Sequence, residues 1–176
     1  SDQYWLKQVD YNIKYDDIQT LAIKRALEKN FLVITGGPGS GKTTIIKSII
    51  DLYQTIHKYN TEKTLEHVAL LAPTGRASKR VSEATNLPAS TIHRFLKWNK
   101  ELNKFAVNEY NKSDVDFVII DESSMVDIFL FDSLLKGLRV DTKIILVGDY
   151  NQLPSVGPGQ LLRDIIDSGR VEVISL

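Results

Sequence analysis

The chain has 176 residues, of which 43% are hydrophobic and 25% are charged, and these values are typical of one globular domain with a single buried core. Its 22 basic and 22 acidic side chains cancel, so any contact with nucleic acid must come from a local patch and not from an overall positive field. The absence of cysteine excludes a disulfide framework, and three scattered histidines argue against a zinc site.

The opening residues are polar and lack the apolar stretch of a secretory signal peptide. No apolar run approaches the roughly 20 residues that a membrane-crossing helix requires. We therefore expect a cytoplasmic protein with no membrane partner, in which residues 1–15 form a lead-in segment and residues 16–176 form one domain.

Short apolar runs rich in β-branched residues alternate along the chain with longer segments of helical periodicity. The runs are continuous, which is typical of parallel strands covered on both faces. We expect strands at 31–35, 68–73, 117–121, 144–149 and 171–175, and helices at 16–30, 42–59, 75–86, 127–138 and 159–169. This order predicts an α/β fold with a mostly parallel sheet and helices on both of its faces.

Three of the expected helices carry apolar residues at helical spacing, which should face the sheet. They are Ile18, Leu21, Ala22 and Leu27 in the first helix, Ile128, Phe131, Leu134, Leu135 and Leu138 in the helix 127–138, and Leu161, Leu162, Ile165 and Ile166 in the helix 159–169. Residues 95–116 break the rhythm with a polar stretch that holds a few aromatic side chains. We expect a peripheral insertion there, a hairpin or a loop.

The stretch GGPGSGKT, residues 36–43, has the spacing G-x-x-x-x-G-K-[ST] between an expected strand and an expected helix. Glycines let backbone N–H groups turn inward around phosphates, and the following helix adds its positive N-terminal end. In such a loop Lys42 reaches the β- and γ-phosphates, and the Thr43 hydroxyl coordinates Mg²⁺. The residues expected to bind the nucleotide are Gly37, Pro38, Gly39, Ser40, Gly41, Lys42, Thr43 and Thr44. The alternative is a glycine-rich turn without a ligand, but the lysine, the threonine and the strand–helix context all favour the phosphate loop.

Asp121 and Glu122 stand where the expected strand 117–121 ends. Ligands of parallel α/β sheets bind beyond the carboxyl ends of the strands, so this pair can face the glycine loop. We expect Asp121 to hold Mg²⁺, directly or through water, and Glu122 to orient and polarise the attacking water. The pair could instead cap the next helix, but Asp127 stands directly before that helix and is the better cap.

The stretch GDYNQLPSVGPG, residues 148–159, joins an expected strand to the last helix. Its glycines and prolines are typical of a linker, but its position favours a loop of fixed path at the carboxyl edge of the sheet. Gln152 is an uncharged amide in this loop and can hydrogen-bond to a phosphate oxygen or to a water bound to it. Arg163, on the helix that follows, should be exposed.

Taken in order, these motifs resemble those of the superfamily 1 DNA helicases, and most closely those of the RecD family, which comprises the exonuclease V alpha subunit and its stand-alone relatives. The resemblance covers residue 16 to the end of the chain, and it rests on DDIQTLAIKRAL, GGPGSGKTT, LLAPTGRASKRVSE, STIHRFL, VIIDESSMVD and GDYNQLPSVGPGQLLRDII. It implies the first of two RecA-like P-loop NTPase domains, driven by ATP and Mg²⁺ along single-stranded DNA from 5′ to 3′.

The same resemblance implies roles for six residues. Gln19 matches a glutamine that reads the adenine edge, and Gln152 matches the residue that senses the γ-phosphate. Thr74, Arg76, Thr91 and His93 lie in segments that touch DNA in the family. Other interpretations stay open: a helix-surface amide for Gln19, a solvated basic helix face for Arg76, and a structural role for His93. Many relatives carry lysine where Arg76 stands, and arginine keeps the charge needed for a phosphate contact.

The resemblance also implies partners. In the family, arginines that touch the γ-phosphate come from a second RecA-like domain of the same parent chain, and subunits of a nuclease complex are further partners. Because an arginine finger contributes roughly 10³–10⁵ in rate to related P-loop enzymes, we expect the isolated chain to bind nucleotide weakly, to hydrolyse it very slowly and to lack helicase activity. The alternatives are the ATPase domain of a Pif1-like or other superfamily 1 helicase, and a DNA- or protein-binding module switched by nucleotide.

Overall fold

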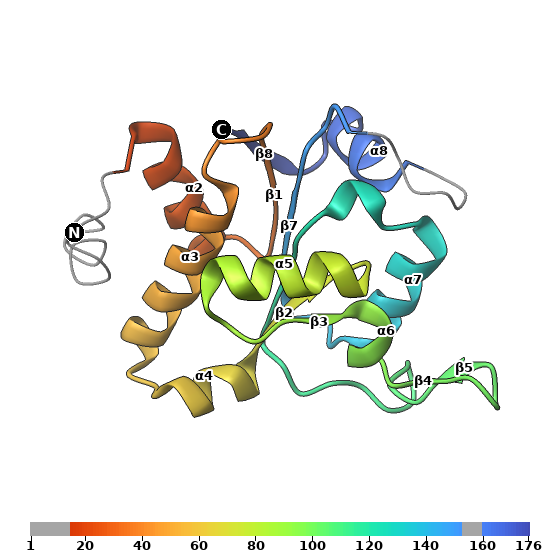
Figure 1. Cartoon of the computed structure of the whole chain (residues 1–176). Coiled ribbons are helices and arrows are strands. Elements are labelled where there is room, and N and C mark those ends of the chain that lie inside the picture. The colour runs from red at the N-terminus through yellow and green to blue at the C-terminus, as the bar shows by residue number, and fades with distance from the viewer. Residues whose placement is uncertain (1–14, 153–159) are drawn as a thin grey trace.

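The computed structural model describes residues 15–152 and 160–176 of the chain. Within them, a six-stranded parallel sheet runs through the middle of the molecule (Figure 1). Its strands are β1 (Phe31–Thr35), β2 (Val68–Ala72), β3 (Ser90–Thr91), β6 (Phe117–Ile120), β7 (Lys143–Gly148) and β8 (Glu172–Ser175), in the order β3-β2-β6-β7-β1-β8. The expected α/β fold with a mostly parallel sheet is confirmed, and β2 and β6 are buried along their whole length, as their continuous apolar runs indicate.

The helices are α2 (Asp17–Glu28), α3 (Lys42–His57), α4 (Thr61–His67), α5 (Gly75–Thr85), α6 (Ile92–Phe95), α7 (Ile128–Gly137) and α8 (Leu161–Asp167), with a 3₁₀ turn, η1 (Ser123–Met125). The sequence did not predict α4 or β3, because each is too short to show a period. Asp127 caps α7 as expected, since its side chain accepts a hydrogen bond from the N–H of Leu130 at 2.8 Å. Among the helices in the described ranges, none has the length and apolar character needed to span a bilayer.

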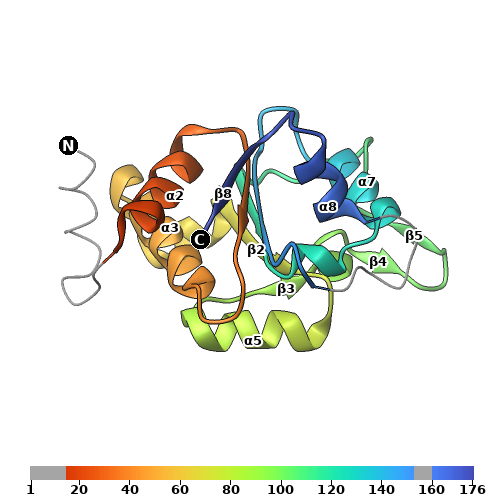
Figure 2. The same ribbon diagram turned by 90° about the horizontal axis from the view of Figure 1, so that it is seen from above.

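Two apolar cores lie on opposite faces of the sheet. On one face, α2, α3 and α5 pack against side chains such as Leu32, Ile34 and Ile119. On the other, α6, α7 and α8 pack against the residues that alternate with them, such as Val33 and Ile120. Figure 2 shows this division from above, with α2 and α3 on one side of the strands and α7 and α8 on the other. Helices on both faces, the second part of the prediction, are therefore present.

The buried face of α2 differs from the predicted one. Ala22 is buried as expected, but Ile18 and Leu21 are 47% and 39% exposed, and Ile23 and Ala26 are fully buried in their place. The helix packs against both α3 and the β1–β8 end of the sheet. The buried line of α2 therefore runs through Ala22, Ile23 and Ala26, because the neighbouring helix and strands decide which apolar side chains are covered.

The predicted face of α7 is correct only in part. Phe131 and Leu134 are buried as expected, whereas Ile128 and Leu135 are each 42% exposed and Leu130 is buried instead. The remaining member of the predicted face, Leu138, is also buried. The face of α7 that is buried in the core is therefore narrower than the apolar face in its sequence.

The stretch 95–116, expected to be a hairpin or a loop, contains an antiparallel hairpin of β4 (Trp98–Asn99) and β5 (Lys104–Phe105). In Figure 1 this hairpin projects from the side of the molecule, beyond α6. The Trp98 and Phe105 rings pack together with their centroids 4.8 Å apart. The aromatic residues of this polar stretch therefore stabilise the hairpin itself.

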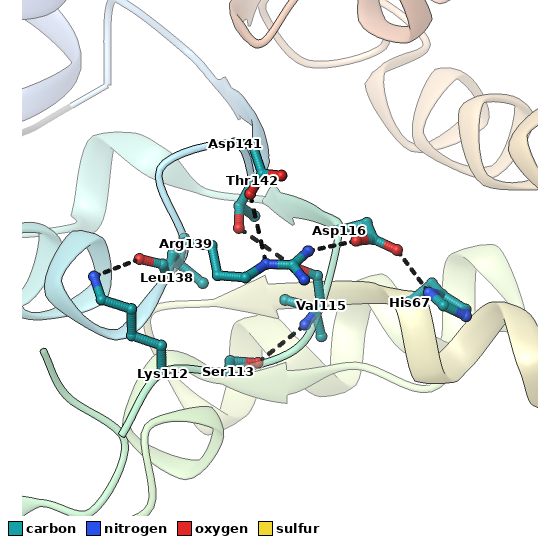
Figure 3. A network of polar contacts seen from close by, with 9 residues as sticks. All are labelled: His67, Lys112, Ser113, Val115, Asp116, Leu138, Arg139, Asp141 and Thr142. Carbon is teal, nitrogen blue, oxygen red and sulfur yellow. Dashed lines mark hydrogen bonds and ion pairs between the residues drawn. The ribbon is translucent and has the colours of Figure 1, made fainter. Parts of the chain in front are cut away.

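A polar network joins distant segments at the amino ends of the strands (Figure 3). Asp116, directly before β6, accepts hydrogen bonds from Nδ1 of His67 at 2.6 Å and from Arg139 at 2.5 Å. Arg139, which follows α7, also donates to the carbonyl of Val115 at 3.3 Å. The network therefore links the start of β2, the start of β6 and the end of α7, at the end of the sheet opposite the glycine loop.

Candidate nucleotide-binding site

The glycine loop connects the end of β1 to the start of α3. Gly39 and Gly41 have φ angles of 74° and 88°, in the left-handed region that favours glycine. A Cβ atom on Gly41 would also lie 2.6 Å from Nε2 of Gln19. The loop therefore needs glycine at these two positions for its backbone path, and a side chain at Gly41 would in addition displace the Gln19 amide.

Lys42 points into the curve of this loop. Its Nζ donates hydrogen bonds to the carbonyls of Gly36 at 2.5 Å and Gly37 at 3.1 Å. Ser40 contributes a buried Oγ that has no hydrogen-bond partner among the described residues. An ammonium group, backbone N–H groups at a helix start and an unpartnered hydroxyl form a donor set that fits a polyphosphate. Thr43 follows on the first turn of α3, half-buried, and Thr44 is exposed.

The acidic pair follows β6, which is separated from β1 by β7 alone. Burial raises the pKa of Asp121 to about 6, against the lowering effects of the Glu122 backbone N–H and of the charges on Lys42 and Arg80. Glu122 has a φ of 53° and a ψ of 42°, a left-handed conformation that is strained for a residue with a side chain. A carboxyl with a raised pKa and a strained neighbour at one turn are typical of a functional site, and the Asp121 carboxylate is the kind of oxygen ligand that Mg²⁺ takes.

Gln152 lies beside this acidic turn, on the same edge of the sheet as Lys42. Its Oε1 accepts a hydrogen bond from Oγ of Ser124 at 3.2 Å, and its backbone N–H donates to the carbonyl of Asp149 at 3.1 Å. The strand before it, β7, lies between the strands that carry Lys42 and Asp121. The rest of the loop, residues 153–159, is outside the described residues.

Gln19 lies against the glycine loop. Its Oε1 accepts from the N–H of Asp16 at 3.2 Å while Asp16 accepts from its N–H at 2.7 Å, so the two residues form a capping box at the start of α2. Its Nε2 donates to the carbonyl of Ser40 at 3.5 Å. The capping box thus holds the amide next to the loop, and its role toward adenine stays a prediction.

The four residues predicted to contact DNA come from the carboxyl ends of two neighbouring strands, β2 and β3. Thr74 caps α5 and Thr91 caps α6, each accepting a backbone N–H at 3.1 Å. Arg76 and His93 are exposed, and the His93 ring packs against Trp98 and Phe105 of the hairpin. The two segments share the edge of the sheet with the glycine loop but lie on the β3 side of it.

Four residues of the site region were not predicted from the sequence, namely Ser124, Tyr150, Arg163 and Asp167. Arg163 was expected to be exposed, but it is half-buried, and its Nε donates to the carbonyl of Tyr150 at 3.0 Å. The expectation was wrong because α8 folds back onto the loop that precedes it. An open pocket of about 420 Å³ lies between this loop and the glycine loop, and its walls include Gly36, Gly37, Tyr150 and Asp167.

A sequence comparison covers nearly the whole of this site. The family model described as an AAA domain matches residues 19–158, from Gln19 to the loop that follows Gln152. The chain belongs to the AAA domain family. Such a domain binds nucleotide, in keeping with the phosphate loop and the acidic turn described above.

The relatives of this AAA domain are RecD-like. It is 37% identical over 174 residues to the RecBCD enzyme subunit RecD of Buchnera aphidicola, covering 88% of this chain and 28% of that protein. It is 40% identical over 128 residues to the ATP-dependent RecD2 DNA helicase of Deinococcus radiodurans, covering 73% of this chain and 16% of that helicase. The chain is thus RecD-like in sequence, and it spans less than a third of the length of either relative.

Solved structures support the fold. The crystal structure of Pif1 helicase from Candida albicans matches 93% of this chain and 40% of the Pif1 chain, with a TM-score of 0.65 and 22% identity. Bacteroides Pif1 bound to single-stranded DNA matches 94% of this chain and 42% of that chain, with a TM-score of 0.58 and 21% identity. Because the identities are low, these structures show a shared architecture, and the sequence relatives favour RecD over Pif1.

Proposed function

We propose that the chain is the ATP-binding and ATP-hydrolysing motor domain of a RecD-like DNA helicase that moves on single-stranded DNA, in the 5′ to 3′ direction by resemblance. One observation carries the proposal: Lys42, the pair Asp121–Glu122 and Gln152 follow three adjacent strands, β1, β6 and β7, and stand together at one edge of the sheet.

The residues divide the chemistry among them. Lys42 and the loop N–H groups bind the phosphates, and Gln19 lies where it can contact the base. The Thr43 hydroxyl and the Asp121 carboxylate would hold Mg²⁺, which neutralises charge between the β- and γ-phosphates when it is bound. Glu122 accepts a hydrogen bond from the attacking water and orients it, and Gln152 contacts the γ-phosphate or that water.

Single-stranded DNA is the proposed substrate track. Thr74, Arg76, Thr91 and His93 would contact its backbone, and they lie at the ends of β2 and β3, next to the strand that carries the acidic turn. A nucleotide-dependent movement at that turn then has a short path to the DNA. The parent protein would act in the cytoplasm.

The proposed partners supply what these residues do not. A second RecA-like domain of the parent protein would contribute the arginines that touch the γ-phosphate. The Buchnera relative is a subunit of a larger enzyme, as its name says, which supports further subunits as partners. Without the second domain we propose that ATP turnover is very slow.

The test is Lys42→Ala in the full-length protein. Removing the ammonium that binds the phosphates should lower ATP turnover at least 100-fold, since removal of one aligned donor from a transition state costs about 10²–10³ in rate. Lys47→Ala is a matched control on the same helix, because Lys47 pairs with Asp51 at 2.7 Å instead of pointing into the loop. Unchanged turnover in Lys42→Ala would count against a catalytic role for this site.

A further inference from the structure

Tyr150 is held at three points in the loop that follows β7. Its N–H donates to Oγ1 of Thr35, the last residue of β1, at 3.0 Å. Its carbonyl accepts from Nε of Arg163 at 3.0 Å, and its hydroxyl donates to Oδ1 of Asp167 at 2.9 Å. Tyr150 thus ties the strand that enters the glycine loop to both ends of α8.

The α8 side of this arrangement is specific to the tyrosine side chain. The Arg163 guanidinium lies over the Tyr150 ring, 5.4 Å from its centroid, while the same arginine binds the tyrosine carbonyl. The hydrogen bond to the Asp167 carboxylate raises the pKa of Tyr150, so the hydroxyl keeps the proton that it donates. A hydrogen bond to a charged acceptor is among the stronger kinds in proteins.

The position of Gln152 follows from that of Tyr150. The two residues belong to one tight turn, in which Asp149 accepts the N–H of Asn151 on its side chain at 2.9 Å and the N–H of Gln152 on its carbonyl at 3.1 Å. Beyond this turn, the Gln152 side chain accepts one hydrogen bond from Ser124, at 3.2 Å, within the described residues. The backbone of the turn is therefore fixed at Tyr150, and the hydrogen bond from Ser124 then orients the Gln152 side-chain amide.

We propose that Tyr150 is a positioning residue for ATP hydrolysis, which fixes the loop after β7 and thereby orients Gln152 toward the reacting phosphate. Arg163 and Asp167 are the α8 partners through which it is fixed. The inference rests on the proposed function, because it requires that Gln152 contacts bound ATP. It adds that α8, through Arg163 and Asp167, sets the geometry of the loop that carries Gln152.

The first test is Tyr150→Phe in the full-length protein. The phenyl ring keeps the packing under Arg163, and the freed Asp167 carboxylate is exposed to water, so the melting temperature should not change. We expect kcat for ATP to fall about three- to tenfold, the range for loss of one hydrogen bond, with KM for ATP unchanged.

Asp167→Asn keeps an acceptor and should stay near the wild-type kcat, whereas Asp167→Ala should match Tyr150→Phe. Tyr110→Phe, at a 91% exposed tyrosine that follows the β4–β5 hairpin, is the matched control.

The second test asks whether Tyr150 acts through Gln152. In a Gln152→Ala background, Tyr150→Phe should lower kcat no further. An equal fall of kcat in both backgrounds, or an unchanged kcat in Tyr150→Phe alone, would overturn the proposal.

A readout without turnover separates this inference from the proposed function. Amide hydrogen exchange in residues 148–152 should speed up in Tyr150→Phe but not in Tyr110→Phe, and equal exchange would overturn the positioning role. If the wild-type protein hydrolyses no ATP, the proposed function fails by itself, and faster exchange in Tyr150→Phe would still support the fixed loop.

Discussion

Asp121 and Glu122 are held in states that cost the folded chain free energy. Asp121 is largely buried, and its pKa is raised to about 6. Glu122 adopts a left-handed backbone conformation, which costs of the order of 1 kcal/mol for a residue with a Cβ. Both costs fall on the residues assigned to the metal and to the attacking water. Such local destabilisation is common where activity requires it.

Replacing Asp121 by asparagine should therefore stabilise the fold and abolish activity. The folded carboxyl binds its proton more tightly than an unfolded one with a pKa of about 3.9, so wild-type stability falls as pH rises from about 4 to about 6 and stays lower above that. Asp121→Asn removes this penalty, and at pH 7 we expect a gain of roughly 1–3 kcal/mol in the free energy of unfolding, measured by urea denaturation. ATP turnover of the full-length variant should be lost.

Asp114→Asn, at an exposed position, is the control and should change neither stability nor turnover. If Asp121→Asn were less stable than the wild type at pH 7, the fold would stabilise the charged Asp121 carboxylate, and the prediction from its raised pKa would be wrong.

At this scale, local spacing predicts some site residues and misses others. Lys42, Thr43 and Asp121 stand in short motifs whose chemistry depends on neighbours within a few positions, so the sequence was enough to propose them as site residues. The contact of Tyr150 with Asp167 requires α8 to return onto the loop, and no local pattern reports that. The strain at Glu122 is also invisible in the sequence, because glutamate has no preference for a left-handed conformation.

Among the elements, strands and long helices follow from the sequence better than the faces they bury. Strand β1 begins and ends where its apolar run does, and the cap of α7 is the predicted Asp127. The prediction of the buried faces of α2 and α7 was partly wrong. The helical period of the sequence shows where apolar residues lie, but the neighbouring elements decide which of them are covered. The short elements α4 and β3 depend on tertiary contacts more than on any pattern of their own.

The Asp116 network joins three elements and should make stability depend on pH. Although burial acts to raise its pKa, hydrogen bonds from His67 and Arg139 outweigh that effect and lower the pKa of Asp116. A lowered folded pKa means that the stabilisation is present above the unfolded pKa of about 3.9 and is lost as pH falls through the folded pKa. Asp116→Asn should therefore cost about 1 kcal/mol at pH 7, a modest value because the side chain is 42% exposed.

The measurement for Asp116→Asn is urea denaturation of both proteins from pH 7 down to pH 3. The difference from the wild type should shrink below about pH 4. Asp141→Asn is the matched control, since Asp141 also faces Arg139, at 3.5 Å, but is 82% exposed. A difference that stays constant with pH would contradict the ion-pair account.

For the whole molecule, the sheet order explains how separate motifs form one site. The strand before Gln152 lies between the strands that carry the glycine loop and the acidic turn, and the strands that precede the DNA-facing residues come next in the same sheet. The alternation of strands and helices predicted a parallel sheet but not this order. The order of the strands depends on how the helices that connect them pack against the sheet, and this packing involves residues from the whole core.

We propose above all that this chain is the ATPase motor of a protein that ATP hydrolysis drives along single-stranded DNA. The measurement that tests it most directly is the rate of ATP turnover as single-stranded DNA is added, in the full-length protein and in the isolated 176-residue chain. We predict strong stimulation in the full-length protein, reduced by added salt because phosphate contacts are screened, and very slow turnover in the isolated chain. Turnover in the full-length protein that does not respond to DNA, or rapid DNA-stimulated turnover by the isolated chain, would contradict the account.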